Sequence, residues 1–216
     1  RLGYSLLGTM NHPAPVEATG LEVDKYDADA VRRYMEHYIG MYRDTVGDEL
    51  IGDRGVRAFL TDSIEAGEAN WTPRFVEKFK QKRGYDPTPW LPAVTGTIVE
   101  SRAKTHAFLY HFRRTLSELM ASEHYGTVAD VAHEHGLIVY GEAQEDQRPN
   151  LGDDMAMRSY ADIPMAAMWT FERELGPKPT YLADMRGAAS VTGNLQAVRR
   201  RARNRPGSIA AFSRNR

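Results

Sequence analysis

The stretch Val56–Phe75, "VRAFLTDSIEAGEANWTPRF", decides the fold. It begins with a short apolar run, residues 56–61, of the length and composition of a buried strand. Two acids, Asp62 and Glu65, follow this run, and Thr72 with a proline after it is typical of a helix start. A strand that leads through carboxylates into a helix is the repeating unit of a parallel α/β sheet. The stretch therefore raises the question of what its acids face.

The same order of elements continues on both sides of this stretch. We expect strands at residues 19–25 and 137–143, and helices at 27–47 and 99–135 with a break at Gly126. The run 137–143 is apolar without alternation, as in a strand buried on both faces of a parallel sheet. The order strand, helix, strand, helix, helix, strand predicts the α/β class, as a doubly wound sheet or a (β/α)8 barrel.

Composition removes several classes of site. The chain has 216 residues, 42% apolar and 26% charged, with a net charge of −1 and no cysteine. Disulfides, thiolate metal sites and cysteine nucleophiles are therefore excluded. The total charge indicates neither nucleic acid nor an anionic membrane as a partner, and no apolar run approaches the ~20 residues that span a bilayer. Because the chain opens without a methionine or a leader, we expect an internal piece of a longer gene product.

Charge is distributed unevenly along the chain. Eight arginines and no acid follow Asp184, so residues 1–184 carry a net charge of −9. From residue 193 the apolar periodicity disappears as well. We therefore expect two parts, a folded domain over residues 1–192 and a basic irregular tail over 193–216. A nucleic-acid-binding arm and an out-of-frame, non-native C-terminus are the alternatives for this tail.

Acidic residues end each expected strand. Asp24 ends the first, Asp62 and Glu65 follow the second, and Glu142 follows the third. The carboxyl ends of parallel strands open onto one face, where α/β proteins bind ligands. We therefore expect these acids to converge on one site. Helix capping, surface salt bridges and metal binding remain alternatives for such acids.

Paired carboxylates are the working groups of glycoside hydrolysis. One is protonated and donates to the leaving oxygen, while the other is ionised and activates water or attacks carbon. Different environments separate the two pKa values. Indole, imidazole and amide groups nearby suit a sugar, and the sequence offers Trp71, Trp169, His12 and Asn70.

Two further motifs suggest metal sites but have simpler interpretations. His133 and His135 are two residues apart, so on a helix they point to different sides, and we expect a helix end there. The segment Gly152–Arg158, "GDDMAMR", is compatible with a calcium loop, but its acids equally suit a helix N-cap.

Four blocks resemble a known family. They are Asn11–Lys25, "LTDSIEAGEANWTPRFVEKFKQKRGYDPTPWLP" at Leu60–Pro92, "FRRTLSELMASEHYGTVADVAHEHGL" at Phe112–Leu137 and "GDDMAMRSYADIPMAAMW" at Gly152–Trp169. Together they resemble bacterial α-L-rhamnosidases of glycoside hydrolase family 106. The resemblance implies a (β/α)8 catalytic domain within a larger multidomain enzyme. It also implies inverting cleavage of terminal α-L-rhamnose from an oligosaccharide or polysaccharide, with Ca²⁺ in the active site.

The resemblance also implies roles for individual residues. Glu65 matches the general acid, and Glu142 matches a second strand-end glutamate that serves as base or calcium ligand. The sugar pocket would be lined by Asn11, His12, Asp62, Asn70 and Trp71.

The chain departs from the family after residues 181–191. A further strand with a glutamate should follow there, but the arginine-rich tail begins instead. We therefore expect a partial (β/α)8 barrel of parallel strands that is inactive alone. The alternatives are a carbohydrate-binding barrel fragment without turnover and a retaining glycosidase.

Overall fold

The structure, a computed structural model, is of the α/β class and describes residues 10–11, 14–64, 69–143, 152–167 and 171–203, with no side-chain detail for 194–203. The helices are α1 (Ala28–Val46), α2 (Phe75–Arg83), α3 (Arg102–Leu119), α4 (Thr127–Glu134), α5 (Asp154–Arg158) and α6 (Pro179–Arg203). The strands are β1 (Ala58–Thr61), β2 (Ile138–Gly141) and β3 (Ile163–Pro164). Short 3₁₀ turns lie at Val16–Ala18, Asp48–Leu50 and Thr88–Thr95, and the π-helical segment η4 spans Met120–Gly126. Within the described part of the chain, no helix is long and apolar enough to cross a membrane.

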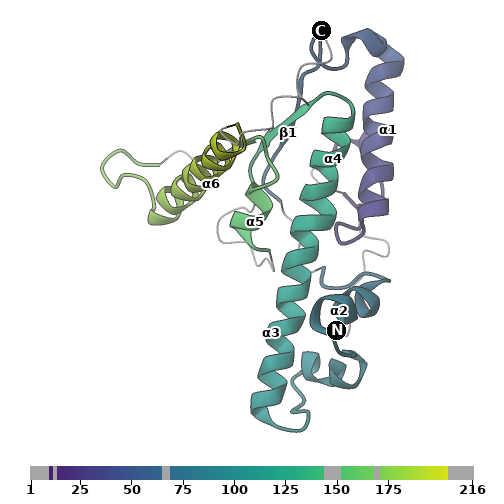
Figure 1. Cartoon of the computed structure of the whole chain (residues 1–216), viewed down its shortest axis with the longest axis vertical. Coiled ribbons are helices and arrows are strands. Elements are labelled where there is room, and N and C mark those ends of the chain that lie inside the picture. The colour runs from purple at the N-terminus through teal and green to yellow at the C-terminus, as the bar shows by residue number, and fades with distance from the viewer. Residues whose placement is uncertain (1–9, 12–13, 65–68, 144–151, 168–170, 204–216) are drawn as a thin grey trace.

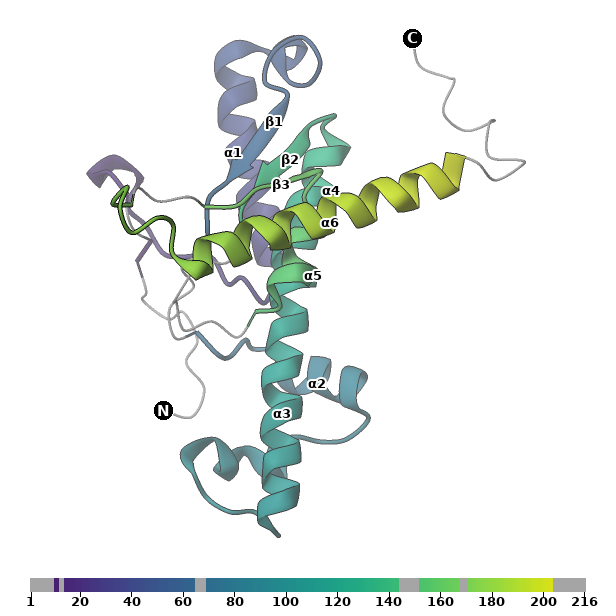
Figure 2. The same cartoon turned by 90° about the vertical axis from the view of Figure 1, so that its left-hand side faces the viewer.

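The three strands form one parallel sheet in the order β1-β2-β3 (Figure 2). This confirms the α/β class and the two strands expected at 56–61 and 137–143. The described sheet is open, so closure into a (β/α)8 barrel stays a prediction. One of its faces is apolar and exposed, because Leu60, Ile138 and Ile163 are 59%, 41% and 53% accessible.

Close contact between β1 and β2 requires a glycine at the end of β2. Gly141 is paired with Thr61 in the parallel register. A Cβ atom on Gly141 would lie 1.9 Å from the hydroxyl oxygen of Thr61 and 2.3 Å from its carbonyl oxygen. Real Cβ atoms do not approach other atoms so closely, so any side chain at this position would push the strands apart.

One long helical rod supports the sheet. α3, η4 and α4 follow one another without a break and run along the long axis of the molecule (Figure 1). The expected break at Gly126 is therefore wrong. Gly126 keeps helical dihedral angles, and a Cβ there would lie 3.1 Å from the ring of Tyr160. The glycine allows close packing rather than ending the helix.

Two apolar clusters form the core. The first lies along α2 and α3 and includes Phe75, Phe79, Phe108, Phe112 and Leu116. The second lies between α1, α4 and the sheet and includes Val31, Ile39, Phe59, Val131 and Val139. Because α1 and α4 cover one face of the sheet (Figure 2), the periodic apolar residues of both helices face the buried side of β1 and β2.

The segment expected as a strand at 19–25 does not join the sheet, so this expectation is wrong. Its only pairing is an antiparallel bridge between Leu21 and Met10 within the described residues, and Leu21 is 73% exposed. Asp24 accepts hydrogen bonds from the Tyr26 amide (2.9 Å) and from the Thr72 hydroxyl (2.8 Å). These bonds turn the chain into α1 instead of extending it beside β1.

Two helix boundaries also differ from the sequence-based expectation. The helix expected from Thr72 begins at Phe75, because the Thr72 hydroxyl bonds Asp24 instead of capping the helix. At the other end of the chain, α6 continues to Arg203, so the irregular tail expected from residue 193 is wrong for residues 193–203. The rest of that tail lies outside the described residues.

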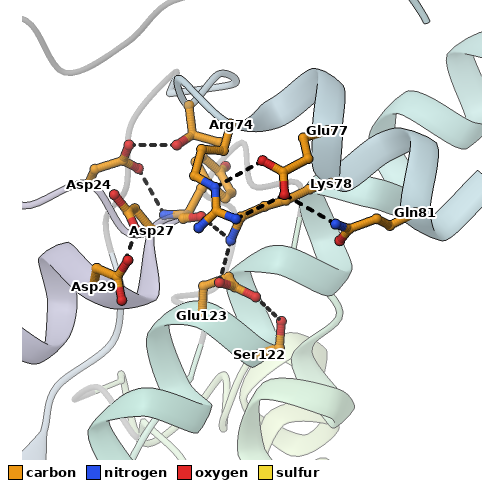
Figure 3. Close-up of polar contacts among 11 residues, drawn as sticks. Asp24, Asp27, Asp29, Arg74, Glu77, Lys78, Gln81, Ser122 and Glu123 are labelled. Atoms are coloured by element: carbon orange, nitrogen blue, oxygen red, sulfur yellow. Dashed lines mark hydrogen bonds and ion pairs between the residues drawn. The ribbon is translucent and has the colours of Figure 1, made fainter. Parts of the chain in front are cut away.

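A largely buried ion pair joins α2 to the helical rod. Lys78 of α2, only 8% exposed, pairs with Glu123 of η4 (Figure 3). The Lys78 ammonium also donates to the carbonyl oxygen of Tyr26 (3.4 Å), and the Ser122 hydroxyl donates to Glu123 (3.0 Å). Buried charges need such partners, because an unpaired one costs several kcal/mol of desolvation. The pair therefore holds α2 against both the helical rod and the turn that leads into α1.

The contact at Gly141 yields a matched pair of glycine substitutions. We expect Gly141→Ala to reduce the free energy of unfolding by about 1–3 kcal/mol, because the new methyl group collides with Thr61. Gly40→Ala should instead raise it by about 0.5–1 kcal/mol, since Gly40 lies inside α1 and its Cβ would meet no described atom within 4 Å. Urea denaturation followed by circular dichroism measures both. Equal effects of the two substitutions would contradict the close approach at Thr61.

The ion pair yields a second test. Lys78→Met should lower the free energy of unfolding by about 2–4 kcal/mol, because Glu123, whose side chain is only 20% exposed, is left without its cation. The double variant Lys78→Met with Glu123→Met should be more stable than the single one, since no charge remains to be buried. Arg74→Met is the control, because Arg74 pairs with Glu77 at the surface and should contribute little. A double variant less stable than Lys78→Met would contradict this account.

Candidate functional site

Two of the predicted acids lie on adjacent strand ends. The parallel pairing of β1 and β2 continues past both strands, because the Glu142 amide donates to the Thr61 carbonyl oxygen (3.0 Å) and the Ile64 amide donates to that of Ala143 (2.8 Å). Asp62 and Glu142 each directly follow their strand, so both leave the sheet at its carboxyl edge. The expected convergence of acids holds for this pair.

The surroundings of Glu142 favour its protonated form. The pKa of its carboxyl group is raised first by burial and then by the negative charge of Asp62. A hydrogen bond with the Ser63 side chain acts in the opposite direction. Asp62 itself is exposed, and its carboxylate accepts the Ser63 amide hydrogen (2.8 Å). A carboxyl group with a raised pKa next to an exposed carboxylate has the asymmetry that acid–base chemistry uses.

A buried arginine completes the charge distribution. The Arg158 side chain is fully buried at the end of α5, where its Nε donates to Asp154 (2.7 Å). Its other nitrogens donate to the Met165 carbonyl oxygen and to Asp184 of α6. Arg158 lowers the pKa of Glu142 and Asp184 raises it, so both charges act at the strand ends.

The remaining predicted residues are placed as follows. Asn11 uses both ends of its amide inside its own loop, accepting from the Gly20 amide (2.8 Å) and donating to the Ala18 carbonyl oxygen (3.1 Å). Trp71 is half-buried against the first core cluster, with its ring 4.8 Å from that of Phe75, and Asn70 beside it is half-buried. Glu65, His12 and Trp169 lie outside the described residues, so their roles stay predictions.

Sequence reasoning missed Ser63, Arg158 and Asp184. A weak signal existed for one of them, because Asp154 and Arg158 are four residues apart in the expected helix and could pair. Ser63 and Asp184 carry no local pattern that marks them. The short strand β3 was also missed, since two residues with a proline carry no strand periodicity.

The two metal-like motifs have structural roles. His135 lies at the C-terminal end of α4 and contacts Glu36 (3.0 Å) and Arg43 (2.9 Å), as expected for a helix end. Asp153 caps α5 by accepting the Ala156 amide hydrogen (3.1 Å). Both observations agree with the simpler interpretations.

Calcium coordination is not complete within the described residues. Asp62 and Glu142 supply oxygen donors of the kind that Ca²⁺ prefers, but the ion takes six to eight of them. No group of three or more histidines, aspartates or glutamates with metal-binding geometry occurs in the described part of the chain. A calcium site here would need further ligands from elsewhere.

A groove of about 530 Å³ lies between α1 and β1, and neither Asp62 nor Glu142 is among its lining residues. Its walls are mostly apolar and aromatic and include Tyr34, Tyr38, Tyr42, Phe59 and Leu60. His124 also lines it, and burial together with the charge of Lys25 lowers its pKa to about 3. The histidine is therefore neutral at physiological pH.

The electrostatics of the strand ends can be tested directly. Asp62→Asn removes a negative charge, so the pKa of Glu142 should fall toward that of an ordinary glutamate. Carbon-13 NMR of the Glu142 carboxyl group during a pH titration, with EDTA present, measures this change. Asp48→Asn, in the turn after α1, is the matched control and should leave the titration where it is. If the pKa of Glu142 is the same in Asp62→Asn as in the wild type, the described geometry is contradicted.

Comparisons with known proteins agree with this arrangement. A family model described as alpha-L-rhamnosidase, of glycoside hydrolase family 106, matches residues 1–195. The solved structure of a rhamnosidase from Novosphingobium sp. PP1Y is 70% identical and has a TM-score of 0.81, over 85% of this chain and 17% of that one. A Formosa agariphila protein provisionally named a beta-glucuronidase is 37% identical over 203 residues, 89% of this chain and 17% of its own length. The chain thus spans about 17% of each relative, and it belongs to glycoside hydrolase family 106.

Proposed function

We propose that this chain forms part of the catalytic domain of a glycosidase that removes terminal α-L-rhamnosyl residues from oligosaccharides or polysaccharides. The observation that carries the proposal is the Asp62–Glu142 pair at adjacent strand ends of a glycoside hydrolase family 106 chain. The rhamnose specificity rests on the name of the family and on that of the Novosphingobium structure.

The proposed mechanism assigns one acid to each strand end. Glu65 follows β1 and acts as general acid toward the leaving oxygen, while Glu142 follows β2 and acts as base toward water or as a ligand of calcium. Inversion requires the two carboxyl groups to lie ~6.5–9.5 Å apart, so that a water molecule fits between them and the sugar. A retaining enzyme would need only ~5–5.5 Å. The raised pKa of Glu142 makes its ionised carboxylate a stronger base toward water than an ordinary glutamate.

We also propose that the domain is a (β/α)8 barrel completed by other parts of a longer polypeptide. Two observations support this. The sheet leaves Leu60, Ile138 and Ile163 exposed on one face, which a closed barrel would cover, and the chain spans about 17% of the length of its relatives. Calcium, implied by the family resemblance, is part of the same proposal, with the missing ligands supplied by residues beyond Asp62 and Glu142.

A second candidate function applies to the chain by itself. Its small share of the relatives' length is compatible with a fragment without turnover, and carbohydrate binding by that fragment would rest on the family alone. The two candidates differ in whether catalysis needs the longer polypeptide.

The deciding experiment measures hydrolysis of p-nitrophenyl α-L-rhamnoside by the 216-residue chain and by the longer polypeptide that contains it. The longer form should be active and should lose activity with EDTA. Glu142→Gln should lower its kcat/KM at least ~100-fold, because general acid–base groups contribute 10²–10⁴-fold. Glu134→Gln, a surface glutamate paired with Arg32, is the matched control and should leave the rate unchanged.

Other outcomes change the proposal in defined ways. Activity on p-nitrophenyl β-glucuronide but not on the rhamnoside would replace the substrate by that in the name of the Formosa relative. Full activity of Glu142→Gln would remove this residue from the mechanism. Unchanged activity in EDTA would remove calcium.

A further inference from the structure

Arg158 is the most deeply buried charged residue near the candidate site. Its side chain has no exposed surface, yet it joins three parts of the fold. It bonds Asp154 within α5, Asp184 in α6 and the carbonyl oxygen of Met165, the first residue after β3. A guanidinium group suits this arrangement, because its planar set of five N–H donors can bond several acceptors at fixed angles.

Asp184 holds the same segment from its other oxygen. One carboxylate oxygen of Asp184 accepts from Arg158, and the second accepts the amide hydrogen of Ala167 (2.7 Å). Arg158 and Asp184 therefore hold both ends of the three residues 165–167. The Met165 amide in turn donates to the carbonyl oxygen of Gly141 (2.8 Å). This segment is thus fixed between the end of β2 and the Arg158–Asp184 pair.

Residues 165–167, which Arg158 and Asp184 hold, lie next to the candidate site. Gly141 directly precedes Glu142, so residues 165–167 run beside the proposed catalytic glutamate. Both members of the pair lie close enough to act electrostatically on Glu142. In a parallel sheet the segments after the strands form the walls of the ligand site.

A purely stabilising role accounts poorly for such a cluster. Well-packed apolar residues generally stabilise a core as well as or better than a buried ion pair does. What an arginine bonded to three separate acceptors adds is fixed geometry. Substrate positioning needs fixed geometry, since a displacement of 1 Å can cost ~100-fold in rate.

We propose that Arg158 and Asp184 are positioning residues that hold residues 165–167 as one wall of the sugar-binding site beside Glu142. The inference rests on the proposed glycosidase function and extends it to residues that do not touch the reacting atoms. Its consequence is that the pair determines how tightly the sugar is held, and not only how stable the domain is.

The test combines two measurements on Arg158→Lys and Asp184→Asn. In the 216-residue chain, amide hydrogen exchange of Ala167 should become at least ~10-fold faster, because the clamp is broken, while exchange of Phe112 inside α3 stays the same. In the active longer polypeptide, the KM for p-nitrophenyl α-L-rhamnoside should rise at least ~5-fold. KM is informative because a loss of folded enzyme lowers the apparent kcat and leaves KM unchanged.

Arg83→Lys is the matched control. Arg83 is also a largely buried arginine between α2 and α3, away from the strand ends, where it forms an ion pair with Glu118 and donates a hydrogen bond to the Thr115 hydroxyl. It should lower stability without changing KM. Faster exchange with an unchanged KM in the Arg158 and Asp184 variants would reduce the pair to a structural clamp and overturn the inference. Unchanged exchange of Ala167 would overturn the clamp itself.

The proposed function and this inference fail in different ways. A wild-type longer polypeptide without activity on any rhamnoside would overturn the proposed function, and with it the sugar-binding role of residues 165–167. If the wild-type enzyme is active and neither substitution changes KM, the proposed function stands and the inference alone is overturned.

Discussion

The close parallel pairing of β1 with β2 is the constraint on which the rest of the structure depends. Thr61 and Gly141 approach so closely that no side chain fits on the glycine. The pairing then continues into Glu142 and Ile64, so the chain leaves both strands in the same direction and at the same level. The acid that follows each strand is thereby brought to one edge, and a site is formed from residues about 80 positions apart in the sequence.

Two buried cations, Lys78 and Arg158, fix how the helices are placed away from the sheet. Lys78 joins α2 to the helical rod, and Arg158 joins α5, α6 and the segment after β3. In both cases a cation with low exposure is balanced by a carboxylate from another element. Such a pair loses hydration free energy on burial, but it fixes the positions of the elements that carry it. Glu142 lies near the second of these clusters, where burial and neighbouring acids raise its pKa. The electrostatic environment of Glu142 therefore depends on charges from several elements and not on one sequence motif.

Much of the fold could be predicted from local patterns. The helix at 27–47 and the strands at 56–61 and 137–143 follow from apolar periodicity and capping rules. The failures occur where distant contacts decide. Residues 19–25 look like a strand, but the side chain of Asp24 bonds Thr72 instead. Gly126 looks like a break, but it fits against Tyr160 inside a continuous helix.

The sequence by itself determined the class of the fold, the positions of Asp62 and Glu142 at strand ends and, through four characteristic blocks, the family. These features are local, because strand length, apolar runs and motif spacing are written in consecutive residues. Only the tertiary structure decided which strands pair, that Arg158 and Asp184 share one short segment, and that the pKa of Glu142 is raised. The physical reason is that hydrogen bonding, burial and Coulomb interaction depend on distances between atoms, and residues far apart in the sequence acquire those distances only when the chain packs.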